Sequence, residues 1–120
     1  MRNFNEKPAY IRLLNLLSAI RELSPLQDLT AEEEKLLGQL TIRWHETDQL
    51  TVGEMMGDAD LVSSSTVYRR LLCLRDKGFI DLPTDIKDKR VRLVLPATLA
   101  KKYMKQLDQC VLKLFNEQGD

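Results

Sequence analysis

The sequence has few of the residues that would indicate a disulfide-bonded, metal-binding or membrane-spanning protein. It contains two isolated cysteines, Cys73 and Cys110, which fit a reducing cytoplasm better than a disulfide framework. The one histidine, His45, has no other ligand spaced near it, so we expect no metal site. No apolar run approaches the ~20 residues that a membrane-spanning helix needs. The N-terminal residues lack the basic and apolar regions of a signal peptide.

Motifs for catalysis are also missing. There is no Gly-rich phosphate loop, no paired-histidine motif and no cysteine cluster. A serine triplet, Ser63 to Ser65, has no histidine base beside it in sequence, and serines at a helix start are far more often caps than nucleophiles. We therefore expect neither an enzyme nor a bound cofactor. A redox-sensing Cys73 is a further hypothesis, but most single cysteines of this kind are small packing residues.

The chain also lacks net charge, because its 18 basic residues balance its 18 acidic ones. The charges are unevenly distributed along the chain, however. Residues 1–63 hold six Lys/Arg and eleven Asp/Glu, a net of −5, whereas residues 64–92 hold eight against four, a net of +4. A local concentration of positive charge is the expected footprint of a DNA-binding segment. The alternative is a solvated charged face that binds nothing.

The strongest structural signal begins within the serine triplet. We expect Ser63 to be a helix N-cap whose hydroxyl accepts a backbone N–H of the first turn. Apolar residues then recur with helical spacing at Val67, Leu71 and Leu74. This spacing predicts a helix over about 64–77 with one buried stripe. Gly78 suits the left-handed position that ends a helix.

Two short strands are predicted after this helix. Residues 79–82 and 90–95 have strand patterns, and Pro96 closes the second strand. The residues between them are polar and typical of a turn. A helix followed by a basic hairpin is the layout of a winged helix. We expect the helix to enter the DNA major groove and the wing, about 82–92, to lie on the minor groove or the phosphate backbone.

The candidate DNA-binding residues share positions away from the buried stripe. On the helix they are Ser64, Ser65, Tyr68, Arg69 and, at the flank of the stripe, Arg70; on the wing they are Lys87, Lys89, Arg90 and Arg92. Planar guanidinium groups match phosphate oxygens and the two acceptors on a guanine edge. Serines at a helix N-terminus suit a phosphate, because free N–H groups and the helix dipole point there.

Two further helices are predicted upstream of this segment. Thr30 is followed three residues later by Glu33, and Thr51 by Glu54, and each pair has the pattern of a capping box. A polar turn over 57–62 then separates the second helix from the winged-helix segment.

Helices are also predicted at both ends of the chain, over 8–24 and 97–117, on either side of a winged-helix core at 30–95. Pro8 suits a first helical turn, and Ser24-Pro25 ends the first helix. Both terminal helices carry broader apolar faces than a small core needs, which favours a homodimer through them. The alternative is that they pack only on each other within one chain. We expect one mainly α winged-helix domain with a small β-hairpin.

The order of these motifs resembles the MarR (multiple antibiotic resistance regulator) type of bacterial winged-helix transcription regulator. The resemblance rests on Ser65-Thr66-Val67-Tyr68-Arg69, on Lys77-Gly78-Phe79-Ile80 and on Asp88-Lys89-Arg90. It implies a dimeric, sequence-specific regulator that binds double-stranded DNA, with Arg90 in the minor groove and Asp88 holding the basic side chains of the wing. The chain departs from the family at Leu95-Pro96-Ala97-Thr98-Leu99, which lacks a glycine that often follows the wing. No small-molecule effector or effector-binding residue can be named.

A winged helix does not by itself fix a function, because the same scaffold also serves protein–protein contacts. The zero net charge and the acidic first half of the chain favour such a role, for example in a replication or partition accessory module. The two interpretations differ in whether the chain binds DNA in a salt-dependent way.

Overall fold

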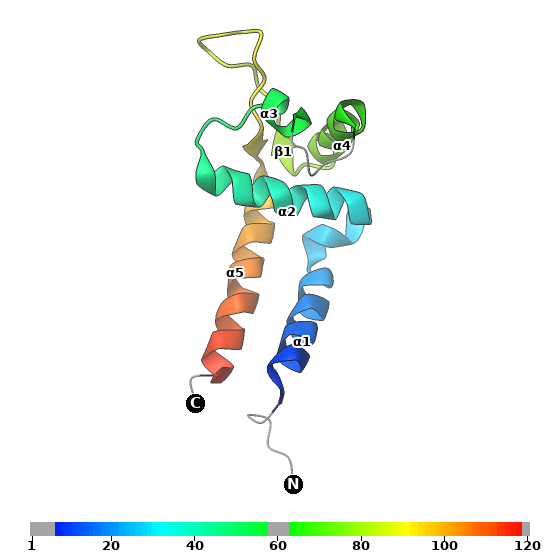
Figure 1. Ribbon diagram of the computed structural model, residues 1–120, viewed down its shortest axis with the longest axis vertical. Coiled ribbons are helices and arrows are strands. Elements are labelled where there is room, and N and C mark those ends of the chain that lie inside the picture. The colour runs from blue at the N-terminus through cyan, green and yellow to red at the C-terminus, as the bar shows by residue number, and fades with distance from the viewer. Residues whose placement is uncertain (1–6, 58–62, 119–120) are drawn as a thin grey trace. The chain divides into compact units, whose positions relative to one another are not determined.

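The structure, a computed structural model, describes residues 7–57 and 63–118. These residues form five α-helices, one 3₁₀ helix and a two-stranded sheet, in the order α1, η2, α2, α3, α4, β1, β2, α5 (Figure 1). They divide into a central unit, residues 28–101, and a terminal unit made of the segments up to 27 and from 102 onward. Most of the predicted turn, 58–62, lies outside the described residues.

The first helix of the central unit, α2 (Ala31–Glu46), begins at the predicted capping box. Thr30 Oγ1 accepts the N–H of Glu33 at 3.1 Å, and Glu33 Oε1 accepts the N–H of Thr30 at 2.9 Å. The next helix, α3 (Val52–Met56), forms only half of its predicted box. Thr51 Oγ1 accepts the N–H of Glu54 at 3.1 Å, but the Glu54 carboxylate accepts the Thr51 hydroxyl rather than the Thr51 N–H.

The predicted recognition helix is α4 (Ser64–Asp76), and its ends agree with the sequence pattern to within one residue. Gly78 follows it with φ +88°, the left-handed conformation that we expect of a glycine there. The core of the central unit comprises Leu36, Leu37, Leu40, Leu50, Met55, Val67, Leu71, Leu74, Phe79, Ile80 and Val94, each at most 3% exposed. All three residues of the predicted apolar stripe of α4 are therefore buried.

The predicted second strand is wrong in its position. The strands β1 (Ile80–Asp81) and β2 (Leu95–Pro96) pair antiparallel, with Ile80 opposite Pro96. Pro96 is thus part of the strand and does not close it. Before β2, only isolated bridges occur in the described chain, Thr84 with Arg92 and Thr51 with Leu93.

The segment before β2 divides its hydrogen bonds between two neighbours, which explains why it forms no regular strand. Leu93 N–H donates to Pro83 O at 2.8 Å, across the wing hairpin. Val94 N–H donates to Leu50 O at 2.8 Å, on the side of α3. This shared pairing connects the base of the wing to the start of α3.

In the terminal unit, α1 (Ala9–Arg21) ends three residues before the predicted end at Ser24. Pro25 has no N–H to give to the Arg21 carbonyl, and its ring would clash with that carbonyl in a continuing helix. The chain instead continues as η2 (Ser24–Asp28), a 3₁₀ helix. The last helix, α5 (Thr98–Gln118), agrees with the predicted 97–117 and contributes its first residues to the central unit. No described helix is long and apolar enough to cross a membrane.

Neither terminal helix encloses its apolar face. No α1 side chain is buried. The exposed large apolar residues of the two helices are Tyr10, Leu13, Leu14 and Leu17 on α1 and Leu112 and Phe115 on α5, each 45% exposed or more. Packing of the two helices within one chain therefore does not use up their apolar surface.

Candidate nucleic-acid interface

The first turn of α4 carries the serine triplet, and its hydrogen bonds differ from the expected ones. Ser63 occupies the N-cap position, but its hydroxyl accepts no backbone N–H of the helix. It lies 2.9 Å from the Thr66 hydroxyl instead, because Thr66, three positions on, offers a competing polar partner. The prediction of the N-cap residue is confirmed, whereas the predicted cap bond is wrong.

The next two serines differ in their surroundings. The Ser64 hydroxyl donates to Met56 O at 3.1 Å, which ties the start of α4 to the end of α3. Ser65 is exposed. Ser64 is thus a structural residue whose oxygen can still accept a hydrogen bond, and Ser65 is the more accessible of the two.

Beyond the serines, the exposed side of α4 carries Arg69. This side chain is exposed, and within residues 7–57 and 63–118 its polar contact is a long one of 3.5 Å to the Thr66 hydroxyl. Tyr68 and Arg70 are half-buried at the edges of the same face, as is Cys73. The helix therefore presents the Arg69 guanidinium to solvent on the side opposite the buried stripe, with the Tyr68 phenol and the Arg70 guanidinium at the edges of that face.

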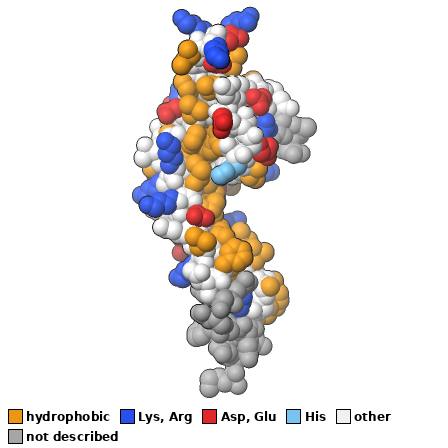
Figure 2. All heavy atoms as spheres, turned by 90° about the vertical axis from the view of Figure 1, so that its left-hand side faces the viewer, with side chains coloured by type: hydrophobic (Ala, Val, Ile, Leu, Met, Phe, Trp, Pro, Cys, Tyr) orange, Lys and Arg blue, Asp and Glu red, His pale blue; other side chains and the backbone are white. Residues whose placement is uncertain are grey.

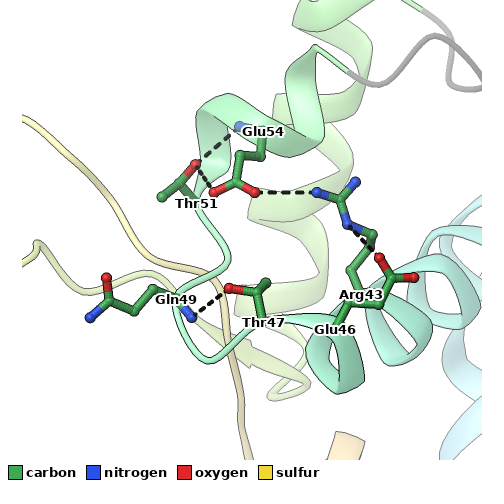
Figure 3. A network of polar contacts seen from close by, with 6 residues as sticks. All are labelled: Arg43, Glu46, Thr47, Gln49, Thr51 and Glu54. Atoms are coloured by element: carbon green, nitrogen blue, oxygen red, sulfur yellow. Dashed lines mark hydrogen bonds and ion pairs between the residues drawn. The ribbon is translucent and has the colours of Figure 1, made fainter.

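A network of polar contacts fixes α3, the helix before α4, to the end of α2 (Figure 3). Arg43 Nη2 lies 3.2 Å from Glu54 Oε2, and Arg43 Nε lies 3.9 Å from Glu46 Oε2. Thr47 Oγ1 accepts the N–H of Gln49 at 3.2 Å where the chain turns toward α3. Partly exposed ion pairs contribute little stability, so we interpret the network as orienting α3. The capping pattern of Glu54 gave no indication of its contact with Arg43 across 11 positions.

The C-terminal end of α4 is held by Lys77. Its Nζ lies 2.6 Å from Glu33 Oε1 and donates to Asp28 O at 2.9 Å, so the start of α2 and the end of α4 are joined. Burial raises the pKa of Glu33, but hydrogen bonds from Lys77 and Thr30 outweigh it and hold the pKa below its ordinary value. Sequence reasoning placed Lys77 in the helix exit and gave no signal for this contact across 44 positions.

The wing extends from the helices of its unit as a hairpin between β1 and β2 (Figure 1, yellow). Its four candidate cations are exposed, and Lys and Arg side chains surround a few acidic ones at its tip (Figure 2, top). Asp88 accepts Arg90 Nε at 3.1 Å and Arg90 Nη2 at 3.3 Å. These bonds, together with one from the Arg90 N–H, hold the pKa of Asp88 below its ordinary value. The expected role of Asp88 in holding the wing is thus confirmed for Arg90.

The base of the wing is fixed to α2 by the single tryptophan. Trp44 Nε1–H donates to Val94 O at 2.8 Å, immediately before β2. The sequence has no metal ligand spaced near His45, and the side chain of His45 is exposed. Among the described residues, no group of three or more His, Cys, Asp or Glu is arranged to hold a metal ion.

Solved structures with a similar arrangement include MarR from E. coli, determined as a cysteine-to-serine mutant in complex with operator DNA. The two chains are 26% identical, the match covers 91% of this chain and 75% of that one, and the TM-score is 0.57. This chain has the MarR-type winged-helix fold. The predicted fold class and family resemblance are therefore confirmed.

Two further solved structures share this MarR-type fold at lower identity. Bordetella bronchiseptica BpsR, whose DNA binding is regulated by 6-hydroxynicotinic acid, is 13% identical, with 98% of this chain and 83% of that one covered and a TM-score of 0.53. A transcriptional regulator from Thermotoga maritima is 17% identical, with 95% and 83% covered and a TM-score of 0.56. No protein-family profile and no curated protein sequence matches the chain.

Within the MarR-type fold, all the candidate residues belong to two features of the central unit, α4 and the wing. Ser64, Ser65 and Arg69 are exposed on α4, and the four wing cations are exposed as well. Tyr68 and Arg70 are only half-exposed, so they rank behind Arg69 as accessible groups. The arrangement suits a polyanion that has grooves. The α4 helix can lie in a groove, and both α4 and the separate basic hairpin carry hydrogen-bond donors for its anionic groups.

Proposed function

We propose that this protein is a sequence-specific transcriptional regulator that binds double-stranded DNA. The observation that carries the proposal is α4, which buries Val67, Leu71 and Leu74 on one face and exposes Arg69 on the other. The 26% identity to MarR, a protein solved with operator DNA, supports the same conclusion. We place α4 in the major groove and the wing on the minor groove or the adjacent backbone.

The two features would divide the work of binding. On α4, Arg69 would read a base edge, since an arginine can donate two hydrogen bonds to guanine O6 and N7. Ser64, Ser65, Tyr68 and Arg70 would add contacts to bases or phosphates around it. On the wing, Lys87, Lys89, Arg90 and Arg92 would contribute affinity through phosphates, which carry no sequence information.

The active form would be a homodimer made through α1 and α5. Both helices expose large apolar side chains, which favours a protein–protein interface over a surface that stays in contact with solvent. A two-fold dimer would present two α4 helices to two half-sites about one helical turn apart. In this proposal the central and terminal units form one functional domain, and the protein works in the cytoplasm, where its cysteines stay reduced.

Fluorescence anisotropy tests the proposal. The purified protein is titrated against its own upstream DNA and against a generic duplex, each at two salt concentrations. We expect tight binding to the upstream DNA that weakens steeply with salt, and much poorer binding to the generic duplex. Equal, weak binding to both would contradict sequence specificity. Absence of binding at low salt would contradict the proposal and direct attention to a protein partner for α4 and the wing.

A further inference from the structure

The wing tip carries an apolar side chain that touches almost nothing in its own molecule. Ile86 is 95% exposed, more than any other large apolar residue of the described chain. It follows Asp85, whose N–H donates to Val91 O at 2.8 Å in the outermost bond that joins the two arms of the hairpin. Ile86 therefore projects beyond the paired part of the wing.

The loop around Ile86 has a defined conformation. Asp85 Oδ1 accepts the N–H of Lys87 at 3.1 Å, and Asp88 Oδ1 accepts the N–H of Arg90 at 3.0 Å. Such bonds from Asp to the backbone two residues on stabilise tight turns. Val91 N–H also donates to Asp88 O at 3.0 Å, which closes a turn where the loop returns to the second arm of the hairpin. Ile86 is thus held at the tip of an ordered turn and would lose little conformational freedom on binding.

The charges around Ile86 favour one kind of surface. The basic residues Lys87, Lys89 and Arg90 follow it at the tip, and all three are exposed. A single apolar side chain among cations is too small a surface for a protein interface, whose fully buried centre is depleted in charge. The DNA minor groove has the matching chemistry, because its sugar walls are apolar and phosphates line both edges.

We infer that Ile86 enters the minor groove and makes the wing selective for A·T over G·C base pairs. This inference rests on the proposed function. Guanine places an exocyclic amino group on the floor of the minor groove, which A·T pairs lack. The isoleucine side chain has no acceptor for this donor, so closing the groove over it would leave the donor unpaired and cost affinity. The wing would then contribute sequence information in addition to charge.

Inosine provides the test, because an inosine·cytosine pair has the major-groove edge of G·C without the minor-groove amino group. Selection from a random duplex library with the wild-type protein defines the binding site, and footprinting locates the pairs beneath the wing. Duplexes with A·T, G·C or inosine·cytosine at those pairs are then compared by anisotropy. We expect the wild type to bind the A·T and inosine duplexes alike and the G·C duplex roughly tenfold more weakly.

Variants assign this preference to Ile86. Ile86→Ala should bind the A·T duplex roughly tenfold more weakly and lose the discrimination against G·C. Ile42→Ala is the matched control, because Ile42 is a 62% exposed isoleucine on α2, and it should leave all three affinities unchanged. Lys89→Ala should weaken all three duplexes equally. Circular dichroism of each variant checks that the fold is intact.

The outcomes separate this inference from the proposed function. If the wild type binds a selected site but Ile86→Ala keeps its affinity and its preference, the inference is wrong and the DNA-binding function stands. If the inosine duplex binds as weakly as the G·C duplex, the amino group is not what the wing reads, and the inference is likewise wrong. If the wild type selects no sequence at all, the proposed function and the inference fail together.

Discussion

Among single residues, Arg69 has the position and chemistry best suited to reading a base. It is exposed on α4, and among the described residues its polar contact is a long one, 3.5 Å from Nη2 to the Thr66 hydroxyl. We predict that Arg69→Ala costs about 1–3 kcal/mol of binding free energy at the preferred site and relaxes the choice of base there. Anisotropy on the selected site and on single-base variants measures both effects.

The matched control for Arg69 lies outside the proposed interface. Lys35 is an exposed cation on α2, and Lys35→Ala removes one positive charge without altering α4 or the helices of the proposed dimer. It should keep both affinity and specificity. Wild-type affinity and specificity in Arg69→Ala would reject the assignment of Arg69 as a base-reading residue.

A wing cation should behave differently from Arg69. Lys89 is exposed at the wing, where phosphate contacts supply affinity without sequence preference. We predict that Lys89→Ala weakens binding to preferred and generic duplexes by about the same factor and reduces the slope of log affinity against log salt by about 1. Titrations at several salt concentrations give this slope. A change confined to the preferred site would contradict a phosphate-contact role.

Sequence reasoning identified the accessible residues of the site better than their hydrogen bonds. It placed Arg69 on the surface because helical periodicity decides which side chains of a helix face away from the core, and it placed Lys87 and Lys89 there because they lie in a polar loop. It could not tell that Ser64 donates to Met56 O, or that Ser63 prefers Thr66 to a backbone N–H. Those choices depend on how the end of α3 packs against the start of α4 and on competition between neighbouring hydroxyls, and residue spacing in the sequence contains neither.

At the scale of elements, the contact between Lys77 and Glu33 joins the end of α4 to the start of α2. The pKa of Glu33 lies below its ordinary value of 4.5, so the folded state holds the carboxylate more tightly than the unfolded chain does. The stability that results is fully present at pH values above the pKa that Glu33 has in the unfolded chain. It is lost as the pH falls through the lower pKa that Glu33 has in the folded protein. We predict that the free energy of unfolding declines below about pH 4.5 and that this decline is shallower in Glu33→Gln.

Urea titrations at several pH values, followed by the fluorescence of Trp44, measure this dependence for the central unit. At neutral pH, Glu33→Gln should destabilise the protein by about 1–3 kcal/mol, because a neutral amide oxygen accepts the hydrogen bonds from Lys77 and Thr30 more weakly than the carboxylate does. Lys77→Ala would leave the Glu33 carboxylate, whose side chain is 7% exposed, without its cation, so this change should also lower the free energy of unfolding at neutral pH. An identical pH profile in the wild type and Glu33→Gln would contradict the contribution of this pair.

Gly78 sets the exit from α4 toward β1. Its φ is +88°, and a Cβ built there would lie 3.5 Å from Leu99 Cδ1, an ordinary contact. Space is therefore sufficient, and the cost of a side chain is backbone strain alone. We predict that Gly78→Ala lowers the free energy of unfolding by roughly 1–2 kcal/mol, measured by urea denaturation. Gly38→Ala is the control, because Gly38 is helical with open space around it, and this change should be neutral or stabilising.

Helices were predicted from the sequence more accurately than strands, for a physical reason. A helix satisfies its own hydrogen bonds, so the apolar spacing and the Thr30–Glu33 box were enough to place α2 and α4. A strand depends on its partners. The alternation of polar and apolar residues over 90–95 was compatible with any neighbouring strand. In the structure, Leu93 N–H bonds to the opposite arm of the wing, whereas Val94 N–H bonds to Leu50 at the start of α3. The local sequence does not indicate which of these two neighbours each residue bonds to.

At the scale of the whole molecule, both terminal helices carry large apolar side chains that are exposed within one chain. Tyr10 on α1 and Phe115 on α5 are 65% and 59% exposed. Sequence reasoning expected this surplus because the apolar positions covered more than one helical face. What it could not provide is the pairing of one chain with another, since that depends on surfaces that meet only in the assembled protein.

We predict a dimer at micromolar concentration whose interface uses these faces. Leu14→Glu and Phe115→Glu should each weaken the dimer by roughly tenfold to a hundredfold, because each replaces a large apolar contact with a charge that must be desolvated. Sedimentation equilibrium gives the mass, and circular dichroism checks that α1 and α5 stay helical. Ile42→Glu is the matched control: Ile42 is 62% exposed on α2 in the central unit, so the variant should keep the dimer mass. A wild-type mass of one chain would reject the dimer and with it the expectation of two half-sites, whereas loss of the dimer in Ile42→Glu would move the interface onto α2.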